Sequence, residues 1–192
     1  MEIRIYFEGN KALRSGFEIF FSDLKAAARQ SRSTLELIVA KDGLSAYRKA
    51  ERTHGHAWNL LLKDSEQSIP ENPVQLCARH GINPGYADRV FWMVELMESW
   101  FRANPHVLAA YYGEGFGRNA IGNPADVERV PKIEVLNRLK DATRNTTKGE
   151  YHKVKHAPFL LEKLDSNQVR GRAEHCRQLF EAVMEKLSQA GS

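Results

Sequence analysis

The chain alternates short apolar runs with amphipathic segments, and this alternation restricts its possible folds more than any other feature. Strand-like runs occupy residues 2–8, 34–40 and 57–63, and helical patterns occupy residues 11–30 and 44–53 between them. Strands that are joined through helices run parallel in most proteins, with the helices packed on the sheet. The sequence therefore predicts an α/β fold with a parallel sheet flanked by helices.

The remainder of the chain is expected to be mainly helical. A fourth strand is predicted at 89–94, followed by helices near 96–101, 105–112, 132–143, 157–164 and 173–187. Residues 113–131 contain four glycines and two prolines, which indicates an irregular segment that is mobile or ordered by a partner. We expect an α/β core over 1–112 and a basic helical extension over 113–192, packed together as one compact unit.

Length and composition are typical of a single globular domain. The 192 residues are 42% hydrophobic, and no apolar run approaches the ~20 residues that would span a bilayer. The N-terminus lacks the pattern of a signal peptide, so we expect a cytoplasmic protein without a membrane partner. Cys77 and Cys176 lie far apart and are expected to be reduced, partly buried thiols.

Positive charge is concentrated in the C-terminal third. From Arg129 to Arg177 there are twelve Lys or Arg and six Asp or Glu, whereas the rest has sixteen basic and eighteen acidic residues. This asymmetry is typical of a surface that binds nucleic acid or another polyanion. The same charge is also compatible with a solvated helical surface that binds nothing.

Acidic residues follow two of the predicted strands. Glu8 ends the first apolar run, and Asp64 and Glu66 follow the leucines at 60–62, while Glu98 lies beyond the fourth strand. The carboxyl ends of parallel strands meet at one edge of a sheet, where ligands collect. Carboxylate oxygens are the ligands that Mg²⁺ or Mn²⁺ prefers. The pattern predicts a metal site, provided that no salt bridge seals off Glu8 or Asp64.

Each acid also has a simpler interpretation. A single carboxylate at a strand end is usually a solvated loop residue, and Glu98 can equally cap its own helix. The combination of Glu8 with Asp64 and Glu66 favours the metal site over these separate explanations.

A second group of candidates lies in the basic segment around residues 148–156. Such a set binds phosphates electrostatically, Tyr151 can stack on a base, and Lys153 or Lys148 can offset charge on a transferring phosphate. A polar loop with a partly buried Tyr151 is the alternative. The candidate nucleic-acid-binding residues are Arg144, Lys148, Tyr151, His152, Lys153 and Lys155.

The acids and their neighbours resemble the Toprim (topoisomerase–primase) family. The matching motifs are Phe7-Glu8-Gly9 and Asp64-Ser65-Glu66, in which Glu66 stands where the family usually has Asp. The resemblance implies a Toprim-like fold, with Glu8 as general acid/base or metal ligand and Asp64 and Glu66 as magnesium ligands.

The chain is further similar to a group of small bacterial Toprim-like proteins. The similarity is strongest at 62–66, 97–101 and 142–153. Members of this group tend to be encoded beside ABC-class ATPases of the OLD/RecF type. This resemblance implies an ATPase partner and a role as an effector in anti-phage defence.

Three functions are compatible with these features. The first is a magnesium-dependent nuclease acting on DNA or tRNA, with Glu8, Asp64, Glu66 and Lys153 as its catalytic residues. The second is a non-catalytic Toprim-fold interaction subunit of an ATPase complex, in which Trp92, Trp100 and Phe116 lie at an interface. For these aromatics, core packing is the alternative. The third, a small-molecule phosphotransfer enzyme, is disfavoured because no glycine-rich phosphate loop is present.

Overall fold

The structure, a computed structural model, describes residues 1–69 and 72–191. Its centre is a parallel sheet with the strand order β2-β1-β3-β4. The strands are β1 (Glu2–Glu8), β2 (Thr34–Ala40), β3 (Trp58–Asp64) and β4 (Val90–Met93). The predicted α/β fold, with a parallel sheet flanked by helices, is confirmed.

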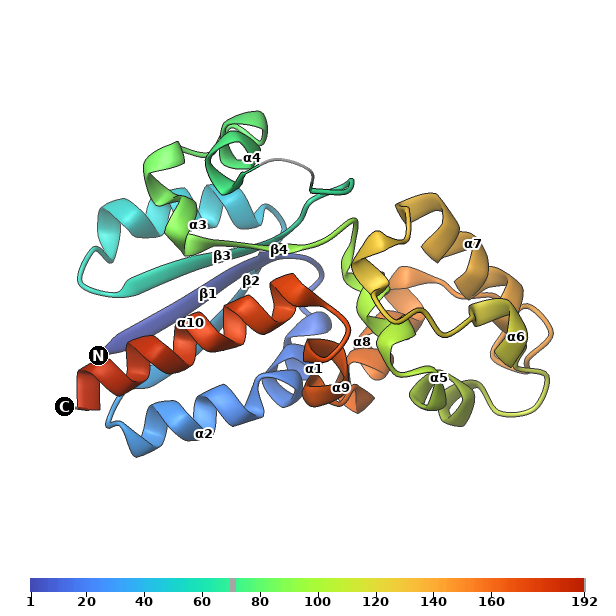
Figure 1. Ribbon diagram of the computed structural model, residues 1–192. Coiled ribbons are helices and arrows are strands. Elements are labelled where there is room, and N and C mark those ends of the chain that lie inside the picture. The colour runs from blue at the N-terminus through green and yellow to red at the C-terminus, as the bar shows by residue number, and fades with distance from the viewer. Residues whose placement is uncertain (70–71, 192) are drawn as a thin grey trace.

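Helices cover both faces of this sheet (Figure 1). On one face lie α1 (Leu13–Phe20), α2 (Ser22–Gln30) and the C-terminal helix α10 (Glu174–Gly191). On the other face lie α3 (Gly43–Thr53), α4 (Pro73–Arg79) and the 3₁₀ helix η1 (Pro84–Arg89).

The alternation of side chains along each strand produces two separate hydrophobic cores. Ile3, Ile5 and Phe7 of β1 enter the larger core, whereas Tyr6 points to the smaller core beside Tyr47 of α3. Both cores are apolar, so the strand residues between Glu2 and Glu8 are almost all buried and the polar residue Glu8 marks the end of the strand.

The remaining helices form a lobe beyond β4, next to the carboxyl ends of the strands (Figure 1). Its elements are η2 (Met97–Ala103), α5 (Pro105–Tyr112), α6 (Arg118–Ile121), η3 (Val127–Arg129), α7 (Lys132–Thr143), α8 (Lys153–Lys163) and α9 (Ser166–Arg170). Residues from before and after position 112 share the larger core, and the division at that position stays a prediction.

Residues 113–131 are more ordered than the glycine and proline content predicts. They contain α6 and η3, and the side chains of Ile121 and Val127 are fully buried in the larger core. The segment is therefore held in place by the protein's own interior, and a partner is not required to order it.

Two helix boundaries differ from the prediction. The helix expected over 11–30 is two helices, because the backbone at Phe21 leaves the helical region (φ −96°, ψ 18°). The helix expected from residue 157 begins at Lys153, and it packs tightly on α1. A Cβ atom on Gly16 of α1 would lie 2.8 Å from Leu161 of α8, so the glycine permits this close approach.

Several other predictions are decided by burial. Trp92 and Trp100 lie in the cores and are not surface residues, while the half-buried Phe116 stacks on Tyr112. Cys77 and Cys176 are free thiols, as expected, and both are fully buried where partial burial was predicted. Within the described residues, no helix combines the length and apolarity needed to cross a bilayer.

Candidate functional site

Glu8 and Asp64 are the last residues of two neighbouring parallel strands, so both lie at the carboxyl edge of the sheet. Glu8 ends β1 and Asp64 ends β3, and Phe7 pairs with Leu62 in the register between these strands. A pocket of about 230 Å³ opens at this edge, lined by Glu8, Gly9, Lys63, Asp64, Glu66, Met93 and Lys153. The structure thus brings together Lys153 and three of the four acids expected as metal ligands.

The loop that carries Glu66 is locked to the loop that follows β4. Glu66 and Glu95 both have left-handed backbones, with φ values of +65° and +62°, and the Glu66 N–H donates to the Glu95 carbonyl at 3.0 Å. Such a conformation costs about 1–2 kcal/mol in a residue other than glycine. Strain of this kind persists where surrounding contacts fix the backbone.

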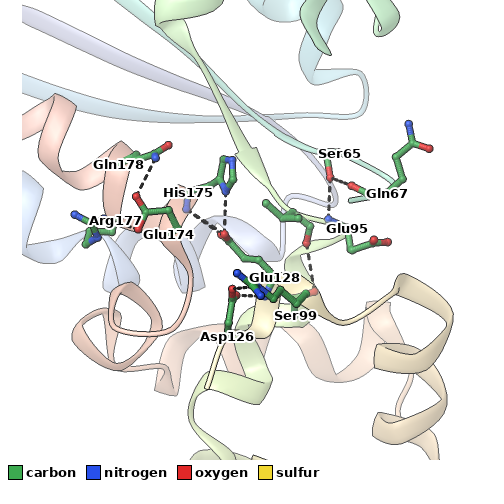
Figure 2. A network of polar contacts seen from close by, with 12 residues as sticks. Ser65, Gln67, Glu95, Ser99, Asp126, Glu128, Glu174, His175, Arg177 and Gln178 are labelled. Carbon is green, nitrogen blue, oxygen red and sulfur yellow. Dashed lines mark hydrogen bonds and ion pairs between the residues drawn. The ribbon is translucent and has the colours of Figure 1, made fainter. Parts of the chain in front are cut away.

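The Ser65 hydroxyl supplies one of those contacts. It accepts a hydrogen bond from the Glu95 N–H at 2.8 Å and donates one to the Gln67 carbonyl, as Figure 2 shows. The side chain of Glu95 then accepts from the backbone N–H of Lys132 at 2.9 Å, at the start of α7. The ammonium group of Lys132 pairs with Glu66. One helix start therefore fixes both left-handed loops.

Glu98 is fully buried behind Asp64, at the start of η2. Its Oε1 accepts a hydrogen bond from the Tyr151 hydroxyl at 2.9 Å, and its Oε2 lies 3.5 Å from the Lys153 Nζ without a regular hydrogen bond. The same Nζ lies 3.7 Å from Asp64 Oδ2, and Asp64 Oδ1 accepts from the Met97 N–H at 2.8 Å. Lys153 therefore bridges a buried carboxylate and a carboxylate that faces the pocket.

This arrangement shifts the protonation of several groups. Burial, with a smaller contribution from Glu98, raises the pKa of Asp64 to about 6, although Lys153 opposes the shift. Burial disfavours the charged form of Lys153, but Glu98 and Asp64 together raise the pKa of its ammonium group. Burial and the neighbouring Glu98 raise the pKa of Tyr151, so this phenol stays protonated and donates to Glu98.

Every acid at this edge has a lysine nearby. Lys63 Nζ lies 3.9 Å from Glu8 Oε2, Lys132 pairs with Glu66, and Lys153 serves Asp64 and Glu98. The Glu8 side chain remains 58% exposed, so its long contact to Lys63 does not seal it off. Asp64 is more enclosed, and its access depends on the position of the half-exposed Lys153.

The donor set suits a hard cation held by few protein ligands. All the acids supply oxygen atoms, but no three His, Cys, Asp or Glu side chains of residues 1–69 and 72–191 cluster closely enough to hold an ion. Mg²⁺ commonly binds one or two carboxylates and completes its shell with water and phosphate. Asp64, together with Glu8 or Glu66, could supply the carboxylates for an ion of that type. Glu98, expected as a fourth ligand, does not line the pocket.

The basic candidates lie in and before α8, and most are exposed. Arg144, which follows α7, has Asp141 3.4 Å away, and Lys155 donates to the Lys148 carbonyl at 3.5 Å. The His152 N–H donates to His156 Nδ1 at 3.0 Å, which closes the first turn of α8. The exposed side chains of Arg144, Lys148, His152 and Lys155 thus stay available to a polyanion.

Tyr151 is the exception among these candidates, and its predicted stacking on a base is wrong. The side chain is only 5% exposed, its backbone N–H donates to Thr143 Oγ1 at 2.7 Å, and its hydroxyl is bonded to Glu98. The ring faces the interior because Glu98 needs a buried donor. Tyr151 therefore contributes to the site through its hydrogen bond to the buried Glu98.

Sequence reasoning missed Lys63, Lys132 and Glu95. Lys63 had a signal, because it directly precedes Asp64 in a run of leucines and a lysine inside a buried strand is unusual. Lys132 and Glu95 had none, since only the folded chain brings the start of α7 to the loop after β4.

A second polar network joins the lobe to the sheet. The carboxylate of Glu128 in η3 accepts from the His175 N–H at 3.0 Å and lies 2.8 Å from His175 Nδ1, at the start of α10 (Figure 2). Val127 N–H also donates to the Arg172 carbonyl at 2.9 Å. These contacts fix α10 on the sheet against the lobe that carries Glu98 and Lys153.

Comparison with solved structures supports the fold assignment. The C-terminal region of the OLD protein from Burkholderia pseudomallei superposes with a TM-score of 0.56 at 11% sequence identity, covering 97% of this chain and 98% of that chain. At this identity the similarity shows a common fold. Among proteins with curated descriptions, none matches this sequence.

The family comparison covers most of the chain. The family described as "Domain of unknown function (DUF4276)" matches residues 22–184, a range that includes Asp64, Glu66, Glu98 and Lys153 and excludes Glu8. The chain therefore belongs to the DUF4276 family.

Proposed function

We propose that this protein is a Toprim-fold hydrolase that uses Mg²⁺ or Mn²⁺ to cleave phosphodiester bonds in nucleic acid. The observation that carries the proposal is the pocket at the carboxyl edge of the parallel sheet. Carboxylates from two strand ends line this pocket together with Lys63 and Lys153. Oxygen ligands for a cation and ammonium groups for a phosphate thus lie at the place where α/β folds usually bind ligands.

The proposal assigns a role to each side chain in the pocket. Asp64 would hold the ion with water and with Glu66 or Glu8, and an exposed Glu8 that is not a ligand would accept or return a proton. The chemistry that a divalent ion would supply there is polarisation of the scissile phosphate and a lowered pKa of a bound water. Lys153 and Lys63 offset negative charge on the phosphate. Glu98 and Tyr151 hold Lys153 in place from the interior.

The substrate and biological setting are also part of the proposal. The exposed basic residues Arg144, Lys148, His152 and Lys155 precede or begin α8, whose first residue is Lys153. A nucleic-acid backbone bound along these basic residues would extend towards the pocket. The Toprim-like resemblance further suggests control by an ABC-class ATPase and a role in anti-phage defence.

The lysine partners favour a second candidate, a non-catalytic Toprim-fold subunit of an ATPase complex. Each carboxylate at the pocket already has a lysine counter-ion, so the acids do not require a metal to offset their repulsion. A protein that has lost catalysis is expected to keep such a neutralised site. Copurification with an ABC-class ATPase, together with no cleavage under any condition, is the result that this candidate predicts.

Cleavage of labelled single-stranded DNA, duplex DNA and tRNA with and without Mg²⁺ or Mn²⁺ tests the proposal. Asp64→Asn should lower a metal-dependent rate at least about a hundredfold, because the ion loses its most enclosed ligand. Asp23→Asn is the matched control, since Asp23 is an exposed acid on α2 that does not line the pocket. Equal cleavage rates for the parent and Asp64→Asn would show that Asp64 has no role in cleavage.

A further inference from the structure

The helical lobe carries one aromatic side chain that is prominently exposed. Of the Phe, Tyr and Trp residues in the described parts of the chain, Phe159 of α8 alone is exposed, at 53%. The other large apolar side chains with comparable exposure are aliphatic, and they include Ile133 and Met184. A single exposed apolar residue is ordinary in a soluble protein. The surroundings of Phe159 are what distinguish it.

A second aromatic ring packs against Phe159. The Tyr111 ring of α5 stacks on it with 6.3 Å between centroids and 18° between planes. Tyr111 also contacts His156, whose centroid lies 6.2 Å away, and His156 lies 6.1 Å from the Tyr151 ring. Phe159 is therefore the outer member of a row of rings that leads inward to Tyr151 and Glu98. A ring packed in this way loses little conformational entropy when it binds a ligand.

Lysines without carboxylate partners surround this ring pair. Lys148 Nζ lies 5.2 Å from the Tyr111 ring centroid. Lys155 and Lys163 lie four residues before and after Phe159, on the same face of α8. Within the described chain, no Asp or Glu forms an ion pair with any of these three lysines, whereas nearby Lys140 and Arg144 are both paired. The surface combines an exposed ring with lysines that form no ion pair in the described chain.

We propose that Phe159 is a stacking platform for an unpaired base of a single-stranded nucleic acid, with Lys148, Lys155 and Lys163 contacting its phosphates. Base stacking on an aromatic ring, flanked by cations that follow the backbone, is the usual way in which proteins bind single strands without sequence preference. A protein partner is the less favourable occupant, because lysine is depleted in the buried centres of protein interfaces. Phe159 thus takes the base-stacking role that the sequence analysis gave to Tyr151, whose ring is buried.

The inference deepens the proposed function, since it assumes that nucleic acid is the ligand of the same lobe. It names single-stranded nucleic acid, or an unpaired loop, as the preferred substrate class. Binding does not require the metal, so the platform is testable apart from cleavage. Failure of cleavage would leave a positive binding result standing, and failure of stacking would not remove the acids from the pocket.

The experiment measures binding of the parent and variants by fluorescence anisotropy in EDTA. The probes are a labelled single strand of about twelve nucleotides, the same strand with every base removed, and the corresponding duplex. The parent should bind the single strand more tightly than the duplex. Phe159→Ala should weaken binding of the single strand about fivefold or more and leave binding of the abasic strand unchanged. Phe159→Trp should bind the single strand with the affinity of the parent. Lys148→Ala should weaken binding of both the single strand and the abasic strand.

Met184→Ala is the matched control, because Met184 is a similarly exposed apolar residue on α10. It should bind all three probes like the parent. Phe159 is on the surface, so circular dichroism should show an unchanged fold in Phe159→Ala. Three results would overturn the proposal. Phe159→Ala binds the single strand as tightly as the parent does, its affinity for the abasic strand falls as much as its affinity for the single strand, or the parent binds none of the probes. In the first and last cases, Phe159 is not a base-stacking platform.

Discussion

The Nζ of Lys153 lies 3.5 Å from Glu98 Oε2 and links this fully buried carboxylate to the pocket. A buried charge is tolerated only when it is paired and hydrogen-bonded, and Tyr151 supplies the hydrogen bond to the other oxygen. The same ammonium group faces Asp64 at the end of β3. Stability and the proposed chemistry therefore depend on one lysine.

Removing the Lys153 ammonium should destabilise the fold. Lys153→Met leaves Glu98 buried without its cation, and we expect a loss of about 1–3 kcal/mol in the free energy of unfolding, below the cost for a wholly buried pair because Lys153 is half exposed. Lys155→Met is the control, since this exposed lysine on the same helix has no carboxylate partner within the described residues. Urea unfolding measures the free energy of unfolding of both variants.

A double mutant measures the interaction energy between Lys153 and Glu98, apart from the other effects of each substitution on stability. Glu98→Gln removes the charge that Lys153 balances, so Lys153→Met combined with Glu98→Gln should cost clearly less than the sum of the two single changes. Additive losses would show that the two side chains do not interact energetically.

Metal binding should depend on pH through Asp64. The pKa of Asp64 in the metal-free protein is raised to about 6, so the folded protein holds this proton more tightly than an unfolded chain does. The stability that this proton contributes is present at low pH and is lost as the pH rises through about 6. A cation needs the deprotonated group, so Mg²⁺ or Mn²⁺ affinity should fall as the pH drops from 7.5 to 5.

Calorimetric titration with Mn²⁺ at pH 5, 6 and 7.5 measures this dependence. Below pH 6 the affinity should fall by up to about tenfold per pH unit, because one proton competes with the ion. Asp64→Asn should bind weakly at every pH and lose most of the dependence. Equal affinity of the parent at pH 5 and pH 7.5 would be inconsistent with Asp64 as a ligand.

Gly43 should be intolerant of a side chain. A Cβ atom there would lie 2.6 Å from the Glu8 backbone nitrogen and 2.8 Å from the Phe7 carbonyl carbon, so Gly43→Ala must displace the end of β1 or the start of α3. We expect a loss of about 1–3 kcal/mol in unfolding free energy and weaker metal binding. Gly55→Ala is the control, since its nearest neighbour would be the Glu51 carbonyl oxygen at 3.7 Å. Thermal unfolding that is the same for both variants would argue against this close approach.

The Ser65 hydroxyl should be needed to hold the two left-handed loops. Ser65→Ala leaves the buried N–H of Glu95 without its acceptor, which costs about 1–3 kcal/mol. Ser15→Ala, which changes an exposed hydroxyl bonded to Glu162, should cost less than about 0.5 kcal/mol. Hydrogen exchange of the Glu95 amide should accelerate in Ser65→Ala only. An unchanged exchange rate would show that other contacts fix the loop.

Much of the sheet and its edge could be predicted from sequence. Buried parallel strands appear as apolar runs, and Glu8 and Asp64 end such runs, so the parallel topology alone places them at one edge. The pairing of Glu98 with Lys153 could not be predicted, because α8 reaches this edge only through the packing of the lobe. The sequence leaves the burial of Tyr151 open, because a tyrosine among lysines looks the same whether its ring faces water or the interior.

Helix boundaries show the same limit. The apolar spacing over residues 11–30 is continuous, yet the chain turns at Phe21 so that α1 packs on α8 and α2 packs on α10. Likewise, the glycines and prolines of 113–131 do not reveal that Ile121 and Val127 enter the core. Tertiary packing decides these features.

Anomalous diffraction from a crystal soaked in Mn²⁺ tests the metal site most directly. The proposed function predicts a manganese peak coordinated by Asp64 and by Glu8 or Glu66, with the Lys153 ammonium moved away from Asp64 Oδ2. A crystal saturated with Mn²⁺ that shows no peak at the carboxyl edge of the sheet, with Lys153 still between Asp64 and Glu98, would contradict it.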